Sequence, residues 1–179
     1  MVPTPTAVSA PPVKLFVAML MAESADRSSI VSMLEEVFGS SDLVGDAIPF
    51  DVTNYYEGEM GTNLARSVIS FTGPHYADAL VPAKLACIEL EKGLAVEGRR
   101  TVNLDVGYLD HSKIVLASTK EAGQKLYVSD GIYADLVARY SQGAYRPFEW
   151  SFPDFKDGRY TKTLEALRRN LLESIKQRE

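Results

Sequence analysis

The stretch FDVTNYYEGEMG, residues 50–61, gathers carboxylates and aromatic hydroxyls into twelve positions. In order, these are Asp51, Tyr55, Tyr56, Glu57 and Glu59. Carboxylate oxygens are the hard ligands that Mg²⁺ or Ca²⁺ prefers, and tyrosines offer a flat face and a hydroxyl to a bound molecule. The five residues are therefore candidates for a ligand or cation site.

The same stretch also has a purely structural interpretation. Asn54 and Glu57 have the spacing of a capping box around a short helical turn, and Gly61 is placed to end that turn in the left-handed region. The sequence alone leaves both interpretations open.

A second group of polar residues follows one strand candidate, NLDVGY at 103–108. Strand alternation places Asn103, Asp105 and Gly107 on one face, with apolar residues between them on the other, and Tyr108 adds a hydroxyl. Buried polar groups need partners, so these side chains either hold loop backbone or face a ligand. Asn103, Asp105 and Tyr108 are further ligand-binding candidates.

Acids from the two stretches could share one cation. We expect Asp51, Glu59 and Asp105 as its ligands, Mg²⁺ or Ca²⁺ as the ion, and Lys120 or Arg66 as the charge that offsets a phosphate. This arrangement would suit a metal-assisted hydrolase or phosphotransferase.

Several common chemistries lack their sequence signatures. The chain has no phosphate-binding GxxxxGK[ST] loop, no GxGxxG, no HExxH and no GxSxG. His75 and His111 lie in predicted loops, Cys87 lies on the apolar face of a predicted helix, and the cluster WSFPDF at 150–155 is interpreted as packing. A nucleophile paired with a base is not evident.

Composition narrows the choice of partner. The 179 residues include 24 acidic and 19 basic side chains, a net charge of −5, and no basic run suited to a nucleic-acid backbone. The single cysteine excludes an intrachain disulfide, and no apolar run reaches the roughly 20 residues that span a bilayer. We expect a soluble protein of the reducing cytoplasm, with a small molecule or a protein as its partner and neither nucleic acid nor membrane.

The first half of the chain is predicted to form the strands and helices that position these residues. Caps, apolar runs and periodicity predict a strand at 14–21, a helix after Asp26 ending at Gly39, strands at 43–52 and 65–71, a helix from about Pro82, and a strand at 101–106. Leu85, Cys87 and Ile88 are expected on the buried side of the second helix, and Glu89, Glu91 and Lys92 outside. The order βαββαβ is that of a ferredoxin-like fold.

The second half reads as an antiparallel β-meander followed by a helix. Strand candidates lie at 113–118, 125–128, 132–140 and 144–150, Asp130-Gly131 is a hairpin signal, and residues 160–177 form an amphipathic pattern. We therefore expect one α+β domain over residues 14–179, preceded by an extended tail at 1–13. In this fold the Asp51–Glu59 turn and the Asn103–Gly107 strand end should meet on one rim of the sheet, with Tyr55 or Tyr56 between them.

Four motifs together resemble a known family. They are FDVTNYYEGEMG, RTVNLDVGYLDHSKIVLASTK, KLYVSDGIYADLVARY and WSFPDF, and the resemblance is to the uncharacterised prokaryotic family catalogued as domain of unknown function 4416. This chain departs from that pattern at Val52, Val106, Asp135, Phe152 and Phe155. The resemblance implies a single-domain protein without an established activity. The resemblance also implies nucleotides as candidate ligands. From the residues, we expect binding of a small anionic metabolite or of a protein partner, without turnover; the metal-assisted enzyme is the alternative.

Overall fold

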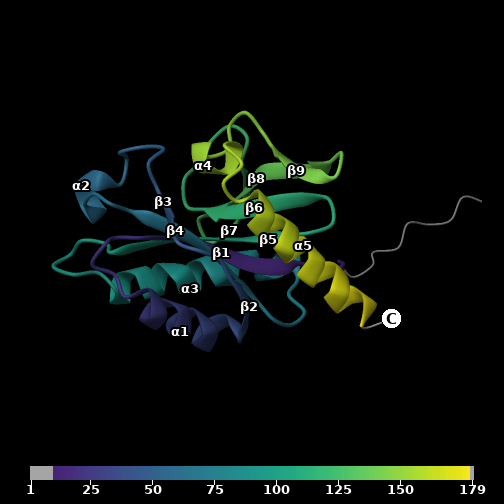
Figure 1. Ribbon diagram of the computed structural model, residues 1–179, viewed down its shortest axis with the longest axis horizontal. Helices are drawn as coiled ribbons and strands as arrows, with labels where there is room; N and C mark the ends of the chain where they lie inside the picture. Colours follow the sequence, from purple (N-terminus) through teal and green to yellow (C-terminus); the bar gives the residue numbers. More distant parts are fainter. Residues whose placement is uncertain (1–9, 178–179) are drawn as a thin grey trace, which may run out of the picture.

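The computed structural model describes residues 10–177, which form a sheet covered by helices (Figure 1). The strands are β1 Lys14–Met21, β2 Ser41–Val44, β3 Ile48–Pro49, β4 Ala65–Phe71, β5 Val102–Leu109, β6 Lys113–Ser118, β7 Leu126–Ser129, β8 Ile132–Ser141 and β9 Ala144–Pro147. The helices are α1 Arg27–Phe38, α2 Glu57–Met60, α3 Leu80–Gly93, α4 Pro153–Lys156 and α5 Thr161–Lys176, with a 3₁₀ turn at Ala77–Ala79. Every strand pair is antiparallel.

The first half has the predicted ferredoxin-like arrangement. The strand order β2-β4-β1-β5 places the apolar strand β1 in the centre, where all eight of its residues are buried. The Asp26 side chain accepts a hydrogen bond from the Ser28 backbone N–H and begins α1, while Gly39, at a φ of 89°, ends it. Helices α1 and α3 pack on the same face of this sheet, as Figure 1 shows. The α+β prediction is confirmed.

The predicted strand at 43–52 is instead two short pieces, β2 and β3. Both pair with β4, as expected, but the chain leaves the regular ladder between them. A Cβ on Gly45 would lie 3.0 Å from the Val68 carbonyl oxygen, which is tighter than ordinary contact, and the Gly45 N–H donates to that same oxygen. The close approach of these two backbones therefore requires glycine at this break.

The second half extends the sheet in an order that differs from a simple meander. Strand β8 lies between β6 and β7, and β9 pairs with the end of β8. The Asp130-Gly131 hairpin forms as predicted, with φ values of 52° and 76° that suit a type I′ turn. Helix α5 covers the second face of the sheet, where Leu164, Leu167 and Leu171 pack near Phe16 of β1.

Residues 1–9 of the predicted tail lie outside the described residues. Val13, also assigned to that tail, is buried and bridges to His75. Within residues 10–177 no helix has the length and apolar character needed to cross a bilayer.

Candidate functional site

The sheet opens between β5 and β6. The two strands pair only where Gly107, Tyr108 and Leu109 face residues 114–116, and beyond this point they separate. A Cβ on Gly107 would collide with the backbone carbonyl oxygen of Val115, so glycine permits the close approach at the apex of the opening. A pocket of about 450 Å³ occupies the space between the separated strands.

Helix α3 satisfies the backbone that the separation leaves unpaired. The Leu104 N–H donates to Glu91 Oε1 at 2.6 Å, and Lys84 Nζ donates to the Leu104 carbonyl oxygen at 2.8 Å. Both side chains are buried and lie seven residues apart on one face of α3. They occupy the hydrogen-bonding positions that a neighbouring strand would take, so the gap in the sheet carries no unpaired peptide group at Leu104.

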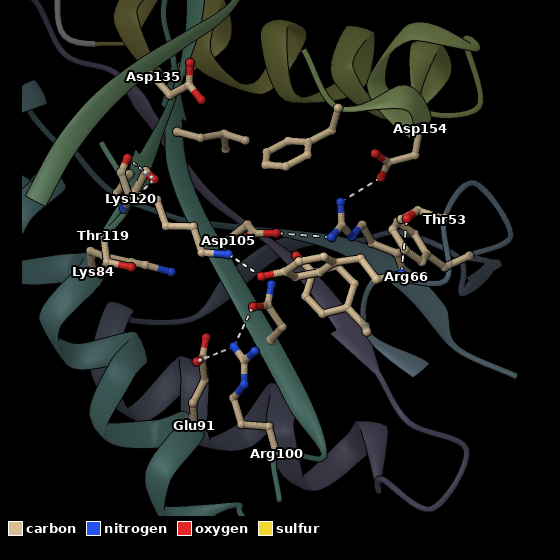
Figure 2. A pocket seen from close by; sticks show the side chains of 18 of the residues that line it. Thr53, Arg66, Lys84, Glu91, Arg100, Asp105, Thr119, Lys120, Asp135 and Asp154 are labelled. Carbon is tan, nitrogen blue, oxygen red and sulfur yellow. Dashed lines mark hydrogen bonds and ion pairs between the residues drawn. The ribbon is translucent and has the colours of Figure 1, made fainter. Parts of the chain in front are cut away.

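Charged side chains of both signs line this pocket, and Figure 2 shows them converging on it from several elements. The cations are Arg66, Lys84, Arg100, Lys120 and Lys125. The carboxylates are Glu91, Asp105, Asp135 and Asp154. Apolar side chains from the strands and loops complete the wall.

Arg66, from β4, holds two of these carboxylates. Its guanidinium lies 2.7 Å from Asp154 Oδ2 and 3.1 Å from Asp105 Oδ2, and it stacks over the Phe50 ring at 4.6 Å. The Tyr160 hydroxyl also donates to Asp154 Oδ2 at 3.0 Å. Arg66 and Asp154 are among the most deeply buried charged residues, with 1% and 0% exposure.

Arg100 links two residues that line the pocket, Asn103 and Glu91, to the stretch at residues 50–61. It forms a two-point pair with Glu59, at 2.6 and 2.7 Å, and donates to Asn103 Oδ1 at 2.9 Å. It also approaches Glu91 at 3.5 Å. Burial raises the pKa of Glu91 more than the Leu104 N–H and the nearby cations lower it.

The mouth of the pocket is crossed by a contact between distant segments. Lys120 Nζ donates to the Tyr55 hydroxyl at 2.5 Å, and the Tyr55 and Tyr56 rings meet edge to face at 5.0 Å. The hydrogen bond from Lys120 lowers the pKa of Tyr55. Burial, with the charge of Asp105, raises the pKa of Tyr56 to about 12. In Figure 2, a dashed line from the labelled Lys120 marks its hydrogen bond to the Tyr55 hydroxyl.

The pocket concentrates polar atoms that lack partners. Among the described residues, five buried side-chain nitrogen or oxygen atoms have no hydrogen-bond partner, and one of them, Arg27 Nε, belongs to a residue that does not line the pocket. The other four are Arg66 Nε, Asn103 Nδ2, Asp135 Oδ1 and Asp154 Oδ1. Buried polar groups are normally hydrogen-bonded, so this cluster indicates that a bound molecule or water completes the site.

The structure brings together five of the nine candidate ligand-binding residues. Those lining the pocket are Tyr55, Tyr56, Asn103, Asp105 and Lys120. The tyrosines of the turn at residues 51–59 and the polar face of β5 thus line one pocket, whereas the acids of that turn lie outside its lining. Tyr108 points to the other face, against the core under α3, and burial raises its pKa.

The three acids expected to share a metal ion are held by three different arginines. Asp51 pairs with Arg159, and Glu59 and Asp105 have the partners given above. Asp51, Glu57 and Glu59 do not line the pocket. Over residues 10–177 no group of three or more His, Cys, Asp or Glu side chains is arranged to hold a metal ion. The geometry therefore does not supply the expected three-carboxylate site.

The expected capping box is also not the local structure. Helix α2 starts after Tyr56 without a side-chain cap, and Thr53 Oγ1, rather than Asn54, accepts a backbone hydrogen bond from Tyr55. Gly61 ends the helix at a φ of 82°, as predicted. The stretch is a tight turn that presents its tyrosines to the pocket.

Sequence reasoning missed several lining residues. Glu91 was expected outside α3 but is 8% exposed, whereas Leu85 was expected inside and is 40% exposed. The signal that could have found the polar pair is the spacing of Lys84 and Glu91, which puts both on the stripe that contains the buried Cys87. Asp135 and Asp154 carry no such local signal, because their partners Lys125 and Arg66 are supplied by other segments.

One family model matches most of the chain. It is described as "Domain of unknown function (DUF4416)" and covers residues 11–171, which confirms the resemblance carried by the four motifs. No curated protein and no solved structure matches the chain.

Proposed function

The chain belongs to the family described as Domain of unknown function (DUF4416), and we propose that this member binds a small anionic metabolite in the opening between β5 and β6, without turnover. The observation that carries the proposal is the cluster of four unpartnered buried polar atoms around one pocket. A pocket of about 450 Å³ lies within the range of small-molecule sites.

The negative charge of the ligand follows from two lysines. Lys84 is 6% exposed, yet its hydrogen-bond partner is a neutral carbonyl oxygen, and it forms no ion pair among the described residues. Lys120 likewise donates to a neutral group, the Tyr55 hydroxyl. Glu91 lies near Lys84, but its carboxylate is engaged by the Leu104 N–H and by Arg100. An anionic ligand would accept the remaining N–H groups of Lys84 and would give the exposed Lys120 a counter-charge.

Binding without turnover is supported by the state of the nucleophiles. Cys87 is buried away from the pocket lining, and burial raises the pKa of its thiol to about 12. Ser118 lines the pocket and accepts from Lys125 at 2.9 Å, but Lys125 also pairs with Asp135 at 3.5 Å. The Ser118 hydroxyl itself donates to the Lys120 carbonyl oxygen at 3.2 Å, so its proton is directed at a backbone oxygen and not at a side-chain base.

Thermal-shift and calorimetric titrations would test anion binding. The probes are inorganic phosphate, citrate and the ribonucleoside monophosphates, applied to wild type and to Lys84→Gln. We expect at least one probe to stabilise wild type and to lose about 10-fold or more in affinity for Lys84→Gln, since charge-assisted hydrogen bonds contribute about 1.5–3 kcal/mol.

Lys92→Gln is the matched control. Lys92 lies on the same helix and pairs with Glu89 at 2.7 Å on the exposed surface. The substitution therefore removes the same charge as Lys84→Gln, but outside the pocket. Lys92→Gln should bind as wild type does. The proposal is wrong if no probe binds, or if both variants lose affinity equally.

We also propose a cytoplasmic location. The free thiol of Cys87 suits a reducing compartment, and the metabolites in question are abundant there. Cell fractionation followed by immunodetection of this chain would test this, and recovery outside the cytoplasmic fraction would overturn it.

A further inference from the structure

We propose that the ligand is dipolar, with an anionic group at the α3 side of the pocket and a protonated amine at the α4 side. This inference rests on the proposed function, because it assumes that the pocket between β5 and β6 is a binding site. It adds a ligand class, a small ω-amino phosphate or ω-amino acid, that anion binding alone does not imply.

The α3 side of the pocket supplies donors. Lys84 Nζ uses one of its three N–H groups on the Leu104 carbonyl, and Asn103 Nδ2 is buried with no acceptor. Arg100 orients this amide by donating to its oxygen at 2.9 Å, which leaves the Nδ2 group as the free donor. Phosphate and carboxylate oxygens are the acceptors that such a group of donors fits.

The α4 side supplies an unpartnered acceptor, Asp154 Oδ1, and an excess of formal negative charge, beside one unpartnered donor, Arg66 Nε. The single guanidinium of Arg66 faces two carboxylates, Asp105 and Asp154, so this cluster carries one net negative charge. Asp154 is 0% exposed, and its Oδ1 has no donor. A buried carboxylate oxygen without a donor is costly, so this position requires an N–H or O–H group from elsewhere.

Charge selects an amine over a hydroxyl at this end. A hydroxyl would satisfy Asp154 Oδ1 but would leave the extra negative charge of the Arg66 cluster uncompensated. An ammonium group supplies the missing donor and balances that charge. The carboxylate of Asp135, whose Oδ1 also lacks a donor, is already matched by Lys125 at 3.5 Å and does not change the balance.

The two charges of the ligand must be separated. In Figure 2, Lys84, Glu91 and Arg100 lie on one side of the pocket and Asp135 and Asp154 on the opposite side, with Asp105 and Lys120 between them. A molecule whose amine and anion sit on one carbon would reach one side only. We therefore expect an extended ligand with its charges at its two ends.

Calorimetric titration of wild type with three matched series would test the dipole. The probes are ω-aminoalkyl, ω-hydroxyalkyl and unsubstituted alkyl phosphates with two to five carbons. We expect one aminoalkyl phosphate to bind about 10-fold or more tightly than its hydroxyl and alkyl counterparts of equal length, as one charge-assisted contact would provide.

Variants locate the amine. Asp154→Asn should lower the affinity of the preferred aminoalkyl phosphate about 10-fold and abolish the preference for the amine. Asp130→Asn, in the exposed β7–β8 turn where asparagine is well tolerated, is the control and should retain the preference. If Asp154→Asn does not fold, the comparison of the three series on wild type still tests whether the ligand carries an amine.

The outcomes separate the two proposals. Equal binding of alkyl and aminoalkyl phosphates, or tighter binding of the hydroxyalkyl series, overturns the dipolar ligand but leaves anion binding in place. Loss of the preference in Asp130→Asn as well as Asp154→Asn also counts against the assignment. Failure of every series to bind, together with failure of the anion probes above, overturns both.

Discussion

Two buried lysines, one in a strand and one in a helix, have different surroundings. Lys14, in β1, is 2% exposed, pairs with Asp42 and donates to the Phe71 carbonyl oxygen at 3.1 Å. Lys84, in α3, is 6% exposed and donates to a carbonyl oxygen without forming an ion pair. Burial alone therefore does not distinguish a lysine that stabilises the fold from a lysine that faces a binding site. A carboxylate paired directly with the ammonium group does.

The acids beside these lysines show the same contrast. Burial raises the pKa of Asp42, but hydrogen bonds from Lys14 and Ser70 outweigh it, and the net pKa is below its ordinary value. For Glu91, near Lys84, burial prevails and the pKa is raised. The charges of Lys14 and Asp42 therefore stabilise each other without a ligand. Around Lys84 and Glu91 the burial of charge remains unfavourable, and an anionic ligand of Lys84 would reduce that cost.

Replacement of Lys14 should have the largest effect on stability. Lys14→Met leaves the Asp42 carboxylate and the Phe71 carbonyl without their donor, and we expect a loss of about 2–3 kcal/mol in the free energy of unfolding. This is below the roughly 3–5 kcal/mol of a fully buried pair because the Asp42 side chain is 20% exposed. Urea unfolding would measure it. A loss below about 1 kcal/mol would show that the pair is not the structural element described here.

The same change at Lys84 should cost less. Lys84→Met frees the Leu104 carbonyl and removes a cation near Glu91, but it also removes a buried ammonium that has no direct ion pair among the described residues. These effects oppose each other, so we expect a change within about 1 kcal/mol. Urea unfolding of both variants in parallel would provide the comparison. A loss for Lys84→Met as large as that for Lys14→Met would mean that Lys84 is as structural as Lys14.

The smallest effect should be a pH-dependent contribution from Glu91. Because the folded-state pKa is raised above the ordinary 4.5, the folded protein retains the proton to higher pH, and this contribution to stability falls as pH rises from 4.5 through the folded pKa. Glu91→Gln keeps an oxygen for the Leu104 N–H but cannot ionise. Its stability relative to wild type should therefore rise over that window, as measured by urea unfolding at several pH values. A relative stability that falls over the window would indicate a lowered pKa.

The sequence predicted elements whose signals are local. Strand β1 and the two ends of α1, at Asp26 and Gly39, were predicted correctly. Helix caps and apolar runs depend on residues that are close in sequence. The insertion of β8 between β6 and β7 was not predicted, since strand order depends on pairing between distant segments.

Site residues were predicted where a polar side chain stands out within a strand pattern. They were missed where the side chain is buried only through a partner distant in sequence. Asn103 and Asp105 were identified from strand alternation, and they line the pocket. Asp154 was interpreted as part of a packing cluster, because its partner Arg66 lies 88 positions away in the chain. Glu91 was assigned to the surface because charged helix residues usually are exposed, and its bond to the Leu104 N–H is a tertiary contact.

The bonds from α3 to Leu104 also bear on the thermodynamics of recognition. Because Glu91 and Lys84 occupy the hydrogen-bonding groups of the open strand, β6 has no free partner at Leu104 with which to close the gap. The cavity is thus preorganised, and a binding molecule need not break strand pairing or order the sheet. Association should accordingly carry a small conformational-entropy penalty, and the slowly exchanging amide expected at Leu104 should stay slow whether the cavity is empty or filled.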